Sequence, residues 1–182
     1  MTWMRDKNLN LNKREAMNYT LEQFKKDVIQ WSTDRLIIQN GSIAGQLQKV
    51  REECAEVSAE IVKFEDGRGE LGKLKKEVGD IAVLLVNIDH MQGSWSDYEF
   101  YYEPDNTKTS PDFLQVKHCL AEIFKETIYT MDNYTNSWDL LLGVCAFLNL
   151  DISECAYLAF KKIEHRKGYF CKETMSFVKE AE

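Results

Sequence analysis

The chain has 182 residues, of which 44% are hydrophobic and 29% are charged, and its formal net charge is −7 at pH 7. This composition allows one domain with a buried core and excludes an intrinsically disordered chain. The acidic balance argues against a general nucleic-acid-binding protein, because such a protein needs a basic surface. A polyanionic substrate stays possible if a cation bridges it to the protein.

The N-terminus and the cysteines favour a soluble, cytoplasmic protein. The N-terminal sequence is polar and lacks an apolar stretch of signal-peptide length. The longest apolar run, DIAVLLVNI, is too short to span a bilayer, so we expect no membrane association. No two of the five cysteines have the C-x-x-C spacing of a zinc ribbon or redox motif, and we interpret them as reduced structural thiols.

The sequence predicts an N-terminal arm over residues 1–19 and a single domain over residues 20–182. The first helix of that domain is expected to begin in the sequence TLEQF, where Thr20 can cap the helix and Gln23 can reach back to it. Apolar residues then recur three and four residues apart, as in an amphipathic helix. We expect this helix to end near the sequence QNG, with Gly41 just beyond its last turn.

The next two helices have the clearest pattern. Apolar residues alternate three and four residues apart from Ile43 to Phe64, a period that fits only a helix. The sequence EDGRGE interrupts this seam, and the same rhythm returns from Leu71 to Ile88. Two helices joined by so short a loop are expected to pack antiparallel, seam to seam.

A different segment follows these two helices. Residues 91–111 are polar, aromatic and turn-forming. Ser110 and Pro111 predict the N-cap and first residue of a fourth helix, which is expected to extend to about Met131. The sequence NYTNS ends it, and a further helix is expected over about 138–148.

The last predicted helix begins with a capping box formed by Asp151 and Glu154. It is expected to extend to about Lys167, with Gly168 as its stop. The remaining tail is expected to be irregular. Because every periodic segment is helical, the sequence predicts an all-α fold.

Acidic side chains follow one stripe on each of the two longest predicted helices. Glu53, Glu56 and Glu60 form the first stripe, and Glu77 and Asp80 form the second. Residues three and four apart return to nearly the same side of a helix, and here that side borders the apolar seam. Antiparallel packing would therefore bring the two stripes together across a groove. Four carboxylates there would offer hard oxygen ligands to Mg²⁺ or Mn²⁺.

A solvated helix face is the alternative explanation, because acidic residues at this spacing are common on exposed surfaces. Two features favour the metal site: the position of both stripes beside the seam, and Gly79, which permits a close helix approach. A di-iron site of the Glu-x-x-His type is disfavoured, because acids occupy the positions three residues after Glu53 and Glu77.

The sequences EECAE and EVGD together resemble the E-E-x-x-E…E-x-x-D signature of the all-α nucleoside triphosphate pyrophosphohydrolases, particularly MazG-like proteins. The sequence IQWSTDRLI followed by QLQKVREECAEV is similar to that family's first two helices. LDISECAYLAFKKIEHRKGYF is similar to its last helix. The resemblance covers residues 20–90 and about 140–180.

The resemblance implies an all-α helical bundle that hydrolyses a nucleoside triphosphate, a (d)NTP, to a monophosphate and pyrophosphate with Mg²⁺. It also implies a homodimer or homotetramer, and the long seam from Ile43 to Phe64 is consistent with more than one neighbour. Carried over by position, the metal ligands are Glu53, Glu56, Glu77 and Asp80.

The resemblance suggests further site residues. Glu52 or Glu60 would position or deprotonate the attacking water, and the sequence does not choose between them. Candidates for contacts with the substrate, each with a structural or solvated side chain as the alternative, are Lys49, Lys162 and Arg166 for the phosphates, Asn87 for a nucleotide hydrogen bond, and Trp31 for stacking on a base. For Trp31, packing in the core is the favoured alternative.

The chain departs from compact relatives in an insertion at about 90–138, which could be a lid, an oligomer contact or an added structural helix. Two other functions stay open. One is hydrolysis of another phosphorylated metabolite, such as phosphoribosyl-ATP, by the same metal chemistry. The other is a non-catalytic helical module that binds a nucleotide or a metal.

Overall fold

The computed structural model describes residues 18–93, 110–129, 136–171, 173 and 176–180. The predicted N-terminal arm, except for its last two residues, lies outside the described residues, as does residue 131, the predicted end of the fourth helix. The part that is described is mostly helical, which confirms the all-α prediction.

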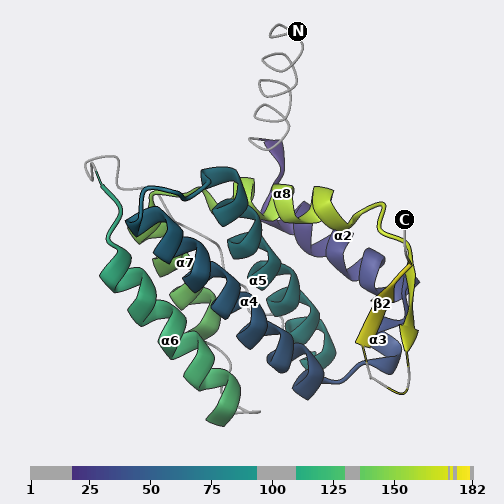
Figure 1. Ribbon diagram of the computed structural model, residues 1–182. Helices are drawn as coiled ribbons and strands as arrows, with labels where there is room; N and C mark the ends of the chain where they lie inside the picture. Colours follow the sequence, from purple (N-terminus) through teal and green to yellow (C-terminus); the bar gives the residue numbers. More distant parts are fainter. Residues whose placement is uncertain (1–17, 94–109, 130–135, 172, 174–175, 181–182) are drawn as a thin grey trace, which may run out of the picture.

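Seven helices and one small hairpin make up the described part of the chain. They are α2 (Leu21–Asp34), α3 (Ile37–Asn40), α4 (Ile43–Glu65), α5 (Leu71–Gln92), α6 (Phe113–Tyr129), α7 (Ser137–Leu148), α8 (Ile152–Ile163), β1 (Gly168–Cys171) and β2 (Ser176–Lys179). In Figure 1, α4 and α5 run side by side through the molecule, with α6 and α7 on one side and α2 and α8 on the other.

The two predicted long helices form the core pair. The α4 residues Leu47, Val50 and Val57 are at most 4% exposed, and α4 packs against α5 and α6 of the same chain. The seam of α4 is therefore covered within one chain and does not by itself require a second copy. Assembly into a homodimer or homotetramer stays a prediction.

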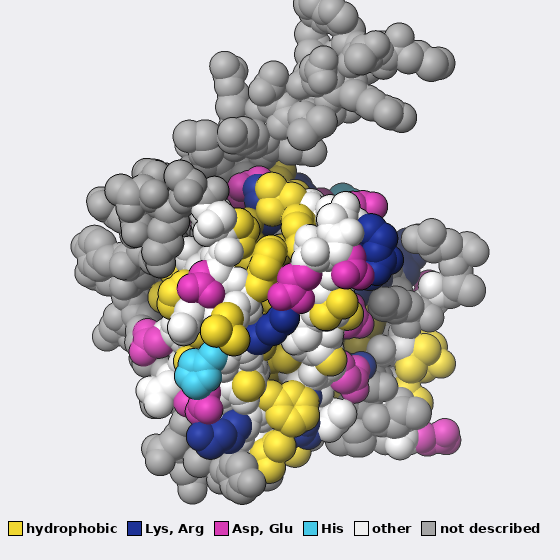
Figure 2. Space-filling view, turned by 60° about the vertical axis from the view of Figure 1, so that its left-hand side comes forward, with side chains coloured by type: hydrophobic (Ala, Val, Ile, Leu, Met, Phe, Trp, Pro, Cys, Tyr) yellow, Lys and Arg dark blue, Asp and Glu magenta, His cyan; other side chains and the backbone are white. Residues whose placement is uncertain are grey.

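Some large apolar side chains stay exposed on α6. Leu114 is 75% exposed, Ile128 is 55% exposed and Phe124 is 41% exposed. Figure 2 shows the side of the molecule that lies to the left in Figure 1, where hydrophobic side chains form patches separated by charged ones. The other half of α6 faces the core, because Val116 and Ile123 are fully buried. Helix α6 thus contributes side chains to the core, and the interpretation of 90–138 as an insertion stays a prediction.

The first predicted helix is wrong at its C-terminal end. Its N-cap is confirmed, because the Thr20 side chain accepts a hydrogen bond from the backbone N–H of Gln23. The helix stops at Asp34, however, and Leu36 adopts a left-handed conformation with φ of 59° before the short helix α3. Because a non-glycine residue seldom adopts this conformation, the bend at Leu36 could not be predicted from the sequence.

The later helices also differ from the sequence-based boundaries. Helix α6 begins at Phe113, and its first turn is capped by Asp112, whose carboxylate accepts from the N–H of Gln115, instead of by Ser110 and Pro111. Asp151 caps helix α8 by accepting from the N–H of Ser153, but Glu154, the other half of the predicted capping box, pairs with Lys75 of α5. The helix ends at Ile163.

The tail is not irregular, as the sequence suggested. Strands β1 and β2 pair antiparallel, with Tyr169 opposite Val178 and Phe170 opposite Phe177. The β-forming residues of the tail are few, and their alternation is too short to be distinguished from a loop in the sequence. The Phe177 ring packs on Trp31 of α2, with ring centroids 5.7 Å apart, which attaches the hairpin to the helical core.

All five cysteines lie among the described residues, and none of them forms a disulfide bond. Burial, assisted by the charge of Glu53, raises the pKa of Cys54 to about 12, so this thiol stays protonated at neutral pH. Within the described residues, no single helix is long and apolar enough to cross a membrane; α7 and α8 pass that test only as a pair bent by 105°.

Helix α8 approaches α5 most closely at Gly79. A Cβ atom placed on Gly79 would lie 2.1 Å from the carbonyl oxygen of Cys155 and 2.7 Å from the Cβ atom of Ala159. Only glycine lets the two backbones come this close. The sequence-based prediction of a close helix approach at this residue is confirmed.

Replacing Gly79 by alanine should push α8 away from α5. We expect Gly79→Ala to lower the free energy of unfolding by about 1–3 kcal/mol, the usual cost of overpacking a core. Gly72→Ala is the matched control in the same helix, since nothing lies within 4 Å of its added Cβ. The control should be neutral or stabilise by up to about 1 kcal/mol. Urea denaturation measures both, and equal effects of the two substitutions would contradict the close approach.

Candidate metal centre

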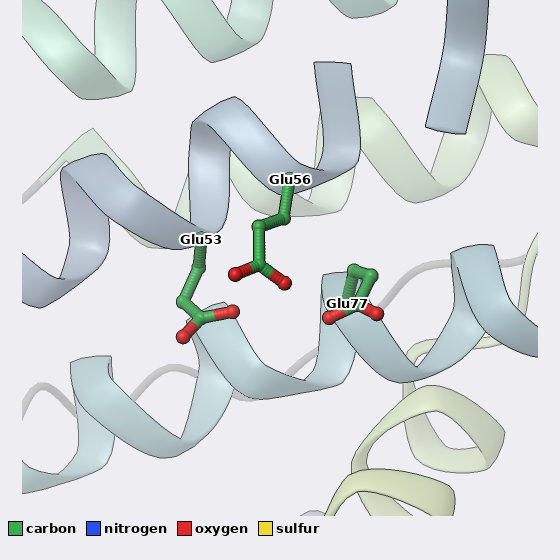
Figure 3. Close-up of side chains that lie close together, drawn as sticks. All are labelled: Glu53, Glu56 and Glu77. Atoms are coloured by element: carbon green, nitrogen blue, oxygen red, sulfur yellow. The ribbon is translucent and has the colours of Figure 1, made fainter. Parts of the chain in front are cut away.

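Three carboxylates converge between α4 and α5. Glu53 and Glu56 project from α4 and Glu77 projects from α5 (Figure 3), and one oxygen from each lies within 4.8 Å of the others. The antiparallel packing of the two helices produces this meeting, because the acidic stripes border the buried seams. The predicted grouping of these three acids is confirmed as a spatial arrangement.

The three acids have different environments. Glu56 is exposed, Glu53 is partly buried, and Glu77 is only 5% exposed. Burial, together with the charges of Asp80 and Glu56, raises the pKa of Glu53 to about 7. Burial also raises the pKa of Glu77, and the nearby Lys162 opposes that rise. Both shifts disfavour the ionised form of these two acids, as expected where acidic side chains crowd together in a partly dry site.

Asp80, the fourth predicted ligand, is engaged by a lysine. Lys162 of α8 forms a hydrogen-bonded ion pair with Asp80, and its ammonium nitrogen is also 3.7 Å from Oε2 of Glu77. Burial alone would lower the pKa of Lys162, but its hydrogen bond and charge interaction with Asp80 raise it on balance. The charge of Arg166 also acts on Asp80 and helps to restrain the rise of its pKa. Of the three predicted phosphate-binding cations, Lys162 therefore contacts the acids, and Arg166 is near enough for its charge to act on Asp80.

These residues fit a hard divalent cation. All the available ligand atoms are carboxylate oxygens, as Mg²⁺ and Mn²⁺ prefer. Within the described part of the chain, Oε2 of Glu77 is buried without a hydrogen-bond partner, and a buried oxygen of this kind normally has one. Lys162 supplies one positive charge to a site that holds up to four negative charges. A bound cation would satisfy both the oxygen and the excess charge.

The two acids predicted to activate water are placed differently. Glu60 is buried and forms ion pairs with Lys63 at 2.5 Å and Lys73 at 2.6 Å, which join the end of α4 to the start of α5. These lysines hold the pKa of Glu60 below its ordinary value, and their contacts give Glu60 a structural role. Glu52 is exposed and pairs with Lys49 on the same helix, so Glu52 is the more accessible of the two acids.

Asn87 occupies a buried polar position on α5, seven residues after Asp80. Its side chain is 2% exposed and donates from Nδ2 to Oε1 of Gln46 over 3.3 Å. Its Oδ1 atom has no hydrogen-bond partner within the described residues. The sequence alone assigns no role to Gln46, although it lies seven residues before Glu53 and thus on the same side of α4.

Trp31 packs in the core. Its side chain is 9% exposed and its indole Nε1–H donates to the carbonyl oxygen of Ile163 over 2.8 Å. The guanidinium carbon of Arg35 lies 4.5 Å from the centre of its ring. These contacts support core packing, and nothing in them favours stacking on a base. Arg35 itself escaped the sequence analysis, because its partners are backbone carbonyls 129 and 131 residues away.

If the acids bind Mg²⁺, millimolar Mg²⁺ should raise the melting temperature by mass action, equivalent to about 2.7 kcal/mol at 100 times Kd. Glu56→Gln should weaken this shift without disturbing the fold, because Glu56 is exposed. Glu22→Gln is the control, since Glu22 is an exposed acid on α2 paired with Lys26. Differential scanning fluorimetry with and without Mg²⁺ checks this. A wild type that does not respond to Mg²⁺ would contradict the site.

Without metal, stability should fall as the pH rises from about 4.5 to about 7. The ordinary pKa of Glu53 is 4.5 and its folded value is about 7, so the folded state binds the extra proton between these values. That stabilisation is present at low pH and is lost as the carboxyl ionises. Glu53→Gln should flatten the slope, with the raised pKa values of Glu77 and Asp80 leaving a remainder. Thermal melts in EDTA between pH 5 and 8 measure both proteins; equal slopes would contradict the shift.

Comparison of the chain with family models, curated proteins and solved structures gives no match.

Proposed function

We propose that this protein is a Mg²⁺-dependent pyrophosphohydrolase that converts a nucleoside triphosphate into a monophosphate and pyrophosphate. The observation that carries the proposal is the convergence of Glu53, Glu56 and Glu77 within 4.8 Å, together with Lys162 on the adjacent Asp80. Acids alone would repel a triphosphate. Acids with a bound cation and two neighbouring basic side chains can bind one.

In this proposal the metal ligands are Glu53, Glu56, Glu77 and Asp80. When bound, Mg²⁺ supplies positive charge that stabilises the negative charge developing on the phosphates. The buried Oε2 of Glu77, which has no hydrogen-bond partner among the described residues and lies 3.7 Å from the Lys162 ammonium group, would gain a direct contact with the metal. The raised pKa of Glu53 would fall, because a nearby cation favours the carboxylate.

Lys162 would exchange partners when the substrate arrives. In the protein without ligand, its ammonium group neutralises Asp80 and lies near Glu77. A cation that binds these acids would release the ammonium group towards the incoming phosphates. Arg166 is already close enough for its charge to act on Asp80, so both basic groups would lie beside the phosphate chain. Lys49 is a weaker candidate for binding the phosphates, because it forms an exposed ion pair with Glu52 on α4.

The reaction would be attack of a water molecule on the α-phosphorus. A carboxylate, for which Glu52 is the accessible candidate, takes the proton of the water, and the bond from the α-phosphorus to the bridging oxygen breaks. Pyrophosphate then leaves with the electron pair. Enzymes that act on the γ-phosphate usually hold it in a glycine-rich backbone loop with a lysine. The sequence GRGELGK does not have that arrangement.

The nucleoside would lie towards Asn87 and Gln46. These residues are seven positions from Asp80 and Glu53 on their own helices, a distance of about 10 Å along a helix axis. A nucleotide whose phosphates reach the acids can span this length. The free Oδ1 of Asn87 could accept a hydrogen bond from the sugar or base.

Product analysis tests the proposal. A panel of (d)NTPs and phosphoribosyl-ATP, incubated with Mg²⁺ and separated by chromatography, should yield a monophosphate and pyrophosphate from at least one nucleoside triphosphate. Glu53→Ala should reduce turnover by at least about 100-fold, since a metal ligand is lost. Glu22→Ala should have wild-type activity. A nucleoside diphosphate as the first product would contradict the proposed reaction. Turnover of phosphoribosyl-ATP alone would identify that compound as the substrate in place of a nucleoside triphosphate. If no compound is turned over, the protein is a non-catalytic binding module.

A further inference from the structure

The end of α8 is fastened to α2 by two side chains. Trp31 donates its indole N–H to the carbonyl oxygen of Ile163 over 2.8 Å. The Arg35 guanidinium donates to the carbonyl oxygen of Arg166 over 2.8 Å and, at 3.4 Å, to that of Glu164. Three carbonyl groups at and just beyond the end of α8 are thus bound by side chains of α2 and its C-cap.

This arrangement meets the needs of a helix C-terminus. The last carbonyl groups of a helix have no partner within the helix, and its C-terminal end carries partial negative charge. A guanidinium offers several N–H donors in one plane and a positive charge that matches that end. Arg35 is itself held in place, because it lies over the Trp31 ring with 4.5 Å between its guanidinium carbon and the ring centre.

The same turn supplies both basic residues of the acidic site. Lys162 is adjacent to Ile163, and Arg166 is the residue whose carbonyl Arg35 binds. The Lys162 side chain pairs with Asp80, and the Arg166 side chain exerts its charge on Asp80. Arg35 therefore contacts the backbone that determines where these two side chains begin.

We propose that Arg35, supported by Trp31, is a positioning residue that holds Lys162 and Arg166 over the acidic site. This inference rests on the proposed function, because those two side chains are the proposed contacts to the phosphates. Arg35 acts through the turn at the end of α8. Loss of its guanidinium would leave the acids in place and allow the two basic groups to move.

A double-mutant cycle on Mg²⁺ affinity tests this without relying on catalysis. Lys162 competes with a cation for Asp80 and Glu77, so Lys162→Gln should bind Mg²⁺ about tenfold more tightly. Arg35→Ala should also bind Mg²⁺ more tightly, because Lys162 is then held less firmly. In the Lys162→Gln background, Arg35→Ala should change the affinity little. Calorimetric titration of Mg²⁺ into the four proteins gives the coupling.

The outcomes separate positioning from a general structural effect. A purely structural role would change Mg²⁺ affinity equally in both backgrounds, and that additive result would overturn the inference. Arg35→Lys and Trp31→Phe serve where Arg35→Ala does not fold, since both keep part of the packing and lose carbonyl contacts. Arg68→Ala is the control, because Arg68 is an exposed arginine that pairs with Asp66, and it should bind Mg²⁺ as the wild type does.

Kinetics provide the second readout. Lys162 and Arg166 would bind phosphates before and during the reaction, so Arg35→Lys should raise KM for the Mg²⁺–triphosphate about tenfold and change kcat less. An unchanged KM would overturn the inference. A wild type without pyrophosphate release would refute the proposed function, while the Mg²⁺ cycle would still decide the positioning role. A wild type that binds no Mg²⁺ would refute both.

Discussion

The close packing of α8 against α5 at Gly79 is the contact on which the acidic site depends. A side chain at this position would collide with the carbonyl of Cys155, and the absence of one lets the two backbones meet. The next residue along α5 is Asp80, and Lys162 reaches it from α8 seven residues after Cys155. With α4 packed along α5 as well, three helices bring acids and bases together from positions far apart in the sequence.

The site holds more negative charge than its own bases neutralise. Like charges at helical spacing destabilise a helix, and burial increases the cost of each unpaired carboxylate. The protein reduces this cost in two ways, by pairing Asp80 with Lys162 and by raising the pKa of Glu53 so that it is partly protonated near pH 7. Oε2 of Glu77 is less well compensated, because it is buried without a hydrogen-bond partner among the described residues and Lys162 lies 3.7 Å away. A cluster that stays unsatisfied in the folded state is suited to bind a cation, whereas a simple solvated surface would have needed neither adjustment.

Sequence periodicity predicted the features that depend on local geometry. The three- and four-residue spacing of the seam and of the acids gave the helix pair, the buried faces and the meeting of Glu53, Glu56 and Glu77. Features that depend on distant partners could not be predicted in this way. The pairing of Glu60 with Lys73 requires the α4–α5 turn to be known, and the bend at Leu36 uses a backbone conformation that its side chain disfavours. The hairpin forms where a short tail packs against Trp31, which is tertiary context overriding weak local preference.

The two sides of the α4–α5 pair have different tasks. On one side, α6 adds core and cross-links: Arg51 of α4 donates to the backbone carbonyl of Thr127 over 2.9 Å, and Lys117 pairs with Glu65 over 2.7 Å. On α7, Trp138 donates its indole N–H to the buried Asp89 of α5 over 2.8 Å. On the other side, α2 and α8 supply the basic groups and the contacts that hold them. The carboxylates thus lie on a braced helix pair, and the basic groups beside them come from the end of α8, which Trp31 and Arg35 hold against α2.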